Sequence, residues 1–213
     1  MKIALIRVRT LPDILIMDNH GSAIEKAFPG LKVTPYCIED QHSGVYDEES
    51  EAKAIPKVAR IGKQIRDADA IVVSCAADPG VSQLKKELRV PVVGAGEAVA
   101  RVSKTLGTSV GVITITGNVP GVIRAELGPQ LRAWRKVAEV TTALDLESEK
   151  SGEGVLAAAG ELVGQGCDVI ALACTGFCTI GIASVINKRF QVPVVDPVWA
   201  AGAVLYTTYL ANR

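Results

Sequence analysis

Short apolar runs rich in β-branched residues alternate along this chain with longer stretches in which apolar residues recur every three or four positions. The first pattern predicts strands and the second predicts helices. The predicted strands are Lys2–Val8, Leu31–Cys37, Ala70–Cys75, Val90–Gly94, Ser109–Thr116, Lys136–Thr142, Val169–Cys174 and Val192–Val195. The predicted helices are Ser22–Phe28, Glu49–Arg66, Val81–Arg89, Glu97–Leu106, Val119–Leu127, Gly152–Gly166, Thr179–Arg189 and Pro197–Ala211.

Several of these strands are continuously apolar, which is typical of strands that are covered on both faces. Strands and helices that alternate in this way predict α/β structure, with parallel sheets and helices on both sides. Pro56 lies inside one predicted helix and indicates either a kink there or a helix that starts near Ile55. The polar stretch from Glu39 to Glu49 predicts an exposed loop, either a solvated connection or a lid.

An internal repeat organises the chain. The segment Asp69–Cys75 (DAIVVSC) aligns with Asp168–Cys174 (DVIALAC), and VPVVG at Val90–Gly94 aligns with VPVVD at Val192–Asp196. The first strand also resembles the segment at Ser109. We therefore predict two similar Rossmann-like lobes related by a pseudo-twofold axis, with the active site in the cleft between them. The first lobe takes residues 1–95, completed by a C-terminal helix over 197–213, and the second takes residues 96–196.

Composition and charge narrow the function classes. The 213 residues are 48% hydrophobic and 22% charged, which is typical of a globular protein. Twenty-three basic residues balance 23 acidic ones, and neither a basic excess for nucleic acid nor a basic run for a membrane surface is present. Arg7 and Arg9 end the apolar N-terminal run, so we expect no signal peptide. Five cysteines at irregular spacing favour a reducing, cytoplasmic location.

Two of the cysteines, Cys75 and Cys174, end equivalent strands of the repeat. Ligands bind beyond the carboxyl ends of strands in open parallel sheets. A turn of small residues leads from each cysteine toward a helix, and a helix N-terminus can lower a thiol pKa. Taken alone, each cysteine is equally explained as a small buried hydrophobe. Because both recur at the equivalent position, we expect them to act together.

Two thiols that face each other across a cleft suit inversion of a stereocentre without a cofactor. One thiolate would remove a proton from one face of a carbon, and the other thiol would deliver a proton to the opposite face. The charge of the first thiolate would keep the second protonated. The backbone N–H groups of Ala76, Ala77 and Gly176 would then stabilise the negative charge of the intermediate.

Further candidates for substrate binding lie near the same strand ends. Thr114 and Thr116 end the first strand of the second half, and their hydroxyls either bind substrate or cap the next helix. Thr175 either donates to the substrate or caps its helix. Asp78 either caps the helix after Cys75 or serves the site, in substrate binding or as a general acid or base. Arg7, or Arg9 beside it, either meets an anionic group or lies at the surface.

The sequence predicts no metal and no cofactor. Cys174 and Cys178 lie one helical turn apart, but a structural zinc site needs four ligands, and neither His20 nor His42 has ligand spacing. The segment GAGEAV from Gly94 lacks the third glycine of a dinucleotide fingerprint. Without a plausible histidine base, thiols and carboxylates are the candidates for proton transfer.

The motifs SCAADPG and GCDVIALACTGF resemble the two cysteine motifs of the aspartate/glutamate/hydantoin racemase superfamily, in its hydantoin racemase branch. The likeness extends to VPVVGAGEAVA, VPVVDPVWAAGA and FPGLKVTPYCIEDQ, and so covers most of the chain. It implies a two-lobed α/β fold, cofactor-independent two-base chemistry at Cys75 and Cys174, a small-molecule substrate and a homo-oligomer.

The chain also departs from the patterns of that superfamily. Ala76 and Ala77 stand where its amino-acid racemases carry Asn-Thr, and Thr175-Gly176 stands where glutamate racemases carry Thr-His, which argues against glutamate. The Asn-Pro-Asn turn typical of hydantoin and allantoin racemases is replaced by IRVRT. Two alternatives therefore stay open. One is maleate isomerase or decarboxylase chemistry, known from related members, and the other is a two-lobed binding protein without catalysis.

Overall fold

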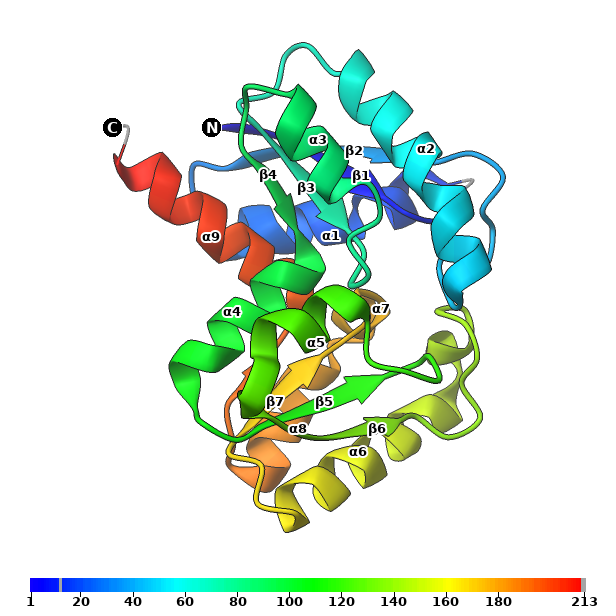
Figure 1. Ribbon diagram of the computed structural model, residues 1–213, viewed down its shortest axis with the longest axis vertical. Helices are drawn as coiled ribbons and strands as arrows, with labels where there is room; N and C mark the ends of the chain where they lie inside the picture. The colour runs from blue at the N-terminus through cyan, green and yellow to red at the C-terminus, as the bar shows by residue number, and fades with distance from the viewer. Residues whose placement is uncertain (12, 212–213) are drawn as a thin grey trace.

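The computed structural model describes residues 1–11 and 13–211, and it places two four-stranded parallel sheets one above the other (Figure 1). The strand order is β2-β1-β3-β4 in the first sheet and β6-β5-β7-β8 in the second. The equal order confirms the predicted two-lobed α/β fold and its internal repeat. Its strands are β1 (Lys2–Arg7), β2 (Lys32–Cys37), β3 (Ala70–Ser74), β4 (Val92–Gly94), β5 (Val110–Thr114), β6 (Leu131–Lys136), β7 (Val169–Leu172) and β8 (Val194–Val195).

Helices cover both faces of each sheet, as continuously apolar strands require. The helices are α1 (Ile14–Ala27), α2 (Glu48–Gln64), α3 (Val81–Glu87), α4 (Ala95–Leu106), α5 (Gly121–Leu127), α6 (Glu149–Gly164), α7 (Gly176–Thr179), α8 (Ile182–Phe190) and α9 (Pro197–Ala211). Two short 3₁₀ turns, η1 (Gly128–Gln130) and η2 (Asp145–Glu147), complete the described elements. None of the helices in the described ranges has the length and apolar character needed to cross a membrane.

The apolar side chains form three clusters. An outer cluster joins the first sheet to α2 and α3, and a second outer cluster joins the second sheet to α6 and α8. The central cluster takes side chains from the inner faces of both sheets, including Leu5, Val72, Val112 and Ala171. The two lobes therefore share one continuous apolar core.

The last helix of each half contacts the other half. α4 follows β4 of the first sheet but packs against α5, β7 and β8. α9 follows β8 of the second sheet but packs against α1, β3 and β4, and the two helices pack on each other between the sheets (Figure 1). The lobe boundaries at residues 95 and 196 stay a prediction, and residues 212–213 of the predicted final helix lie outside the described residues.

In both halves an aspartate makes the same hydrogen bonds at the beginning of the sheet. The carboxylate of Asp69 accepts the backbone N–H of Lys2 at 2.7 Å, and that of Asp168 accepts the N–H of Ser109 at 2.9 Å. Backbone N–H groups of the two aspartates donate back to the carbonyls of Lys2 and Ser109. Each aspartate thus fixes its cysteine-bearing strand in register beside the first strand of its own half.

Several predicted element boundaries were wrong. The edge strand of the second sheet is β6 at Leu131–Lys136 rather than Lys136–Thr142. Val137 and Val140, which suggested the later position, lie in the irregular segment after β6 and are buried in the outer core. α1 begins at Ile14 instead of Ser22. The helix predicted from Thr179 is α8 and begins at Ile182, after Gly181 in the left-handed region at φ 64°, and the short helix α7 precedes it.

α2 runs through Pro56 without a break between Glu48 and Gln64. Pro56 has no N–H to donate to the carbonyl four residues earlier, so one bond of the helical ladder is absent at that point. A capping box compensates at the start, where Ser50 donates its N–H to Asp47 at 2.8 Å and accepts the N–H of Asp47 at 3.0 Å. The helix therefore starts at the edge of the cleft described below, and not near Ile55.

Gly96 allows the start of α4 to approach the turn after Cys75. A Cβ atom at Gly96 would lie 2.1 Å from the carbonyl oxygen of Ala76. We predict that Gly96→Ala lowers the free energy of unfolding by about 1–3 kcal/mol, because the backbone must shift to relieve the overlap. Urea unfolding followed by circular dichroism measures the change.

Gly152→Ala is the matched control, because nothing lies within 4 Å of a Cβ at that position of α6. Removing glycine from a helix should stabilise the protein there by about 0.5–1 kcal/mol. Equal stability of Gly96→Ala and the wild type would show that α4 does not need this close approach.

Candidate active site

The carboxyl ends of β1, β3, β5 and β7 open on a single cleft of about 710 Å³ between the lobes. In parallel α/β sheets this edge is where ligands bind. The start of α2 and the loop before it form a further wall. The lining residues are Arg7, Val8, Arg9, Gly44–Glu49, Glu51, Ser74–Ala77, Ile115–Gly121, Ala143, Glu147, Ala173–Gly176 and Thr179.

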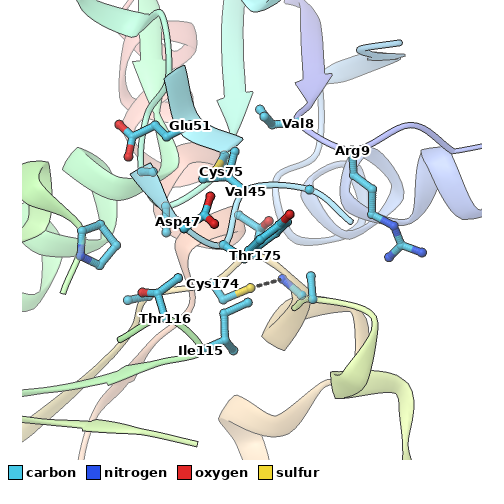
Figure 2. A pocket seen from close by; sticks show the side chains of 18 of the residues that line it. Val8, Arg9, Val45, Asp47, Glu51, Cys75, Ile115, Thr116, Cys174 and Thr175 are labelled. Atoms are coloured by element: carbon cyan, nitrogen blue, oxygen red, sulfur yellow. Dashed lines mark hydrogen bonds between the residues drawn. The ribbon is translucent and has the colours of Figure 1, made fainter. Parts of the chain in front are cut away.

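Cys75 and Cys174 both line this cleft, one after β3 and the other after β7 (Figure 2). Both thiols are free, and Cys174 is 9% exposed. The backbone N–H of Gly176 points to the Cys174 sulfur at 3.4 Å, and the N–H of Ala77 makes the equivalent contact with Cys75. The two halves thus present a thiol with an N–H donor two residues later at equivalent positions.

Burial controls the acidity of both thiols. It raises the pKa of Cys174 to about 11, and it raises the pKa of Cys75 further. Contacts with the backbone N–H groups of Ala77 and Gly176 act in the opposite direction but are smaller. Any lowering of the thiol pKa by a helix N-terminus is therefore outweighed in the free protein by desolvation of the thiolate.

Arg7 contributes a positive charge that acts on Cys174. Its side chain is 7% exposed, and its guanidinium donates to the carbonyl oxygen of Met17 at 3.1 Å. Burial and the neighbouring Arg9 lower the pKa of Arg7 to about 10. The charge of Arg7 in turn favours the Cys174 thiolate, against the larger effects of burial and of the neighbouring Asp196, which raise the pKa of Cys174. Cys174 has the lower of the two thiol pKa values.

Most of the predicted substrate-binding residues meet in this cleft. Arg7, Ala76, Ala77, Thr116, Thr175 and Gly176 all line it. The Thr116 hydroxyl donates to the carbonyl of Asn118 at 2.6 Å and accepts the hydroxyl of Thr114 at 2.7 Å, which leaves one lone pair for a ligand. The Thr175 hydroxyl donates to the carbonyl of Ser74 at 3.3 Å, from one lobe to the other.

Thr114 and Asp78 do not line the cleft. Thr114 is fully buried, and its hydroxyl oxygen accepts the backbone N–H of Thr116, which supports the loop after β5. The Asp78 carboxylate accepts the N–H groups of Gly96 and Glu97, both at 2.7 Å. It therefore caps α4, while the predicted capping role concerned the helix after Cys75. Burial raises the pKa of Asp78 to about 7.

The wall formed by α2 and its preceding loop is acidic. Asp47, Glu48, Glu49 and Glu51 line the cleft, and Figure 2 shows Asp47 and Glu51 projecting from this wall. Burial and the neighbouring Glu48 raise the pKa of Glu51. Sequence reasoning assigned these residues to an exposed loop or a helix start. Acid-rich first turns are common for reasons of helix stability, so the residue types gave no separate signal.

The loop before α2 is held in place by Gln41, which is 8% exposed. Its amide donates to the carbonyls of Gly44 and Ser50 at 3.1 and 3.0 Å. Its backbone N–H donates to the hydroxyl of Thr10 at 2.7 Å. These bonds fix the loop against the segment after β1, so Val45 and Tyr46 reach the cleft from an ordered backbone.

Two polar contacts at the cleft were not foreseen from the sequence. Arg9 forms an ion pair with Glu147 of η2 at 3.3 Å, which joins the two lobes. His20 of α1 is 1% exposed and contacts the hydroxyls of Ser74 and Thr179. Its neighbours are distant in sequence, so no local pattern could reveal them. No group of three or more His, Cys, Asp or Glu residues that could hold a metal occurs in the described part of the chain.

Comparison with known proteins places this architecture in a family. The model of the Asp/Glu/hydantoin racemase family matches residues 19–205. The chain belongs to that family. A hydantoin racemase from Paenarthrobacter aurescens is 31% identical over 140 residues, which are 62% of this chain. The matched segment spans 58% of that relative's length.

Two solved structures extend the family likeness to the whole fold. An allantoin racemase from Pseudomonas fluorescens superposes with a TM-score of 0.85 at 25% identity, covering 100% of this chain and 92% of the other. A glutamate racemase from Bacillus anthracis superposes with a TM-score of 0.72 at 19% identity, covering 99% of this chain and 82% of the other. These similar proteins are racemases, a class of isomerase, and they share the two-lobed fold of the racemase family.

The thiol acidities of this racemase-family chain can be measured by alkylation. Below its pKa a thiol is mostly protonated, so the thiolate fraction grows about tenfold for each pH unit. We predict that the alkylation rate of Cys174 by iodoacetamide rises throughout pH 7–10, with Cys75 slower at each pH. Peptide mapping by mass spectrometry at timed intervals separates the two sites.

Arg7→Met should slow the alkylation of Cys174 further, because it removes the positive charge that favours the thiolate. A rate that reaches its plateau below pH 8.5 at either cysteine would show that the helix N-terminus, and not burial, controls that thiol.

Proposed function

We propose that this protein is a cofactor-independent racemase or epimerase that acts at a carbon next to a carbonyl, with Cys75 and Cys174 as its two bases. The observation that carries this proposal is the equivalent placement of the two thiols. Each follows the central strand of one pseudo-symmetric half, and both line one cleft. Two acid–base groups reaching one cleft from different lobes suit proton removal and return on opposite faces of a substrate.

The proton and electron balance is simple. The Cys174 thiolate takes the proton from the substrate carbon and becomes a thiol, the electron pair of the C–H bond forms a C=C bond to the carbonyl carbon, and the π pair of the carbonyl moves to its oxygen. The resulting enolate then takes a proton from the Cys75 thiol on its other face, which leaves a Cys75 thiolate. The opposite enantiomer is converted by the same steps with the two cysteines exchanged.

The raised thiol pKa has two opposite effects on this step. It makes each thiolate a stronger base toward a carbon acid, and it reduces the fraction of thiolate present near neutral pH. Arg7 offsets part of the second effect at Cys174. The N–H groups of Ala77 and Gly176 contact the sulfurs in the free protein, and we expect them to donate to the enolate oxygen when a substrate is bound.

The charges around the cleft bear on the class of substrate. Asp47, Glu48, Glu49 and Glu51 form one wall, which disfavours a substrate with two carboxylates and favours N–H groups that can donate to these oxygens. A hydantoin-like cyclic ureide meets both conditions, and an amino acid with a neutral side chain meets them in part. The names of two similar proteins, a hydantoin racemase and an allantoin racemase, support the same class.

The test is stereocentre exchange in deuterated water. We predict that the wild type incorporates deuterium into 5-substituted hydantoins and inverts them faster than the uncatalysed background. Cys75→Ala and Cys174→Ala should each lower the inversion rate by at least about 100-fold, because each removes one acid–base group. Proton NMR measures exchange, and polarimetry measures inversion.

Cys37→Ala is the matched control, since Cys37 lies in β2 and does not line the cleft. Its inversion rate should equal that of the wild type. Survival of inversion in both single cleft variants would end the two-base proposal. A covalent adduct trapped on one cysteine, with the other dispensable, would favour the isomerase or decarboxylase alternative. Tight binding without turnover would favour a binding protein.

A further inference from the structure

We propose that His20 is a positioning residue that fixes the end of β3, immediately before Cys75, relative to the short helix after Cys174. The inference rests on the proposed two-thiol function. It concerns a buried imidazole that takes no part in the proton transfers described above. His20 belongs to α1, outside both cysteine motifs, and it does not line the cleft.

Both ring nitrogens of His20 are occupied by hydroxyl groups from different lobes. Nδ1 lies 2.8 Å from the hydroxyl oxygen of Ser74, the residue immediately before Cys75. Nε2 lies 3.1 Å from the hydroxyl oxygen of Thr179, in the short helix after Cys174. A neutral imidazole has one donor and one acceptor nitrogen, and a hydroxyl can serve either. The ring therefore matches both partners without carrying a charge.

A third hydrogen bond makes these contacts a closed hydrogen-bond cycle. The hydroxyl of Thr175, which directly follows Cys174, donates to the backbone carbonyl of Ser74 at 3.3 Å. Thr175 and Thr179 lie one turn apart at the two ends of α7, so Ser74 and His20 form hydrogen bonds to the same helical turn. This hydrogen-bond cycle thus links Ser74, the residue before Cys75, to Thr175, the residue after Cys174.

The position of His20 favours a fixed, uncharged ring. It is 1% exposed, and burial together with the positive charge of Arg7 lowers its pKa well below the usual value for histidine. A contact with the backbone of Thr175 acts in the opposite direction and is smaller. A buried polar group with both nitrogens satisfied is costly to displace, because displacement leaves its partners unpaired. His20 therefore resists any shift of the end of β3 relative to the short helix after Cys174.

The expected consequence concerns the geometry of proton return. Inversion requires the second thiol to lie on the opposite face of the enolate, and a displacement of about 1 Å can cost about 100-fold in rate. If the second thiol is displaced, the first thiol returns a solvent-derived proton to the face it came from. The substrate then exchanges its hydrogen without inversion. The ratio of exchange to inversion thus reports the relative position of the two thiols, and it does not depend on the fraction of folded protein.

Three substitutions test the two hydrogen bonds separately. His20→Asn keeps a polar atom near Nδ1, His20→Gln keeps one near Nε2, and His20→Leu keeps neither. We expect His20→Leu to lower inversion about tenfold or more, to raise the exchange-to-inversion ratio at least threefold and to change KM little. His20→Asn and His20→Gln should give intermediate ratios, since each retains one partner.

Ser103→Ala is the control for loss of a buried hydrogen bond elsewhere. Ser103 is fully buried in α4, and its hydroxyl donates to the carbonyl of Val99 at 2.7 Å. Its exchange-to-inversion ratio should equal that of the wild type even if the protein is less stable. An unchanged ratio in all three His20 variants, with activity falling only as the folded fraction falls, would overturn the inference.

A second measurement does not require activity, so the two proposals can fail separately. In His20→Leu, the alkylation rates of Cys75 and Cys174 should change at least threefold relative to the wild type. Cys167, which is 4% exposed in the outer core, should stay protected and so exclude general unfolding. Wild-type protein without any inversion would defeat the proposed function alone. Unchanged alkylation of both cleft thiols in His20→Leu would defeat the positioning role.

Discussion

Burial of two thiols at the carboxyl ends of parallel strands is the constraint on which this site depends. β3 and β7 are covered on both faces, so their chains open on the cleft only beyond their carboxyl ends. The same burial that holds Cys75 and Cys174 in place makes their thiolates costly. Burial therefore fixes the position of each thiol and at the same time makes the thiol a weaker acid. Backbone N–H groups, and Arg7 at Cys174, offset only part of the cost of forming the thiolate.

The sequence predicted the fold well where burial is two-sided. The central strands are continuously apolar, and the repeated aspartate before each cysteine strand makes the same hydrogen bond in both halves. The prediction failed at β6, the edge strand of the second sheet, which is buried on one side only. β6 contains Arg132 and Arg135, and only part of its surface is buried, so its pattern was weaker than that of the apolar residues just beyond it. The start of α1 was missed because its first turns do not show a clear apolar period.

The site was predictable only in the parts that repeat. Cys75 and Cys174 were visible because one half of the chain could be read against the other. His20 has no counterpart in such a comparison, and its partners lie 54 and 159 residues away. Asp78 was recognised as a cap but assigned to the wrong helix. It adopts a positive φ of 55°, and its carboxylate caps the start of α4.

The placement of α4 and α9 has a consequence for how the chain folds. α4 contacts β3 and β4 of its own sheet as well as β7 and β8 of the other, and α9 contacts β3 and β4, so the last helix of each half bridges the two sheets. Neither half can complete its own apolar layer alone, since the central cluster draws on both sheets. We therefore expect the cleft to form in the same step as the shared core, so that neither half would present its thiol on a stable fold alone.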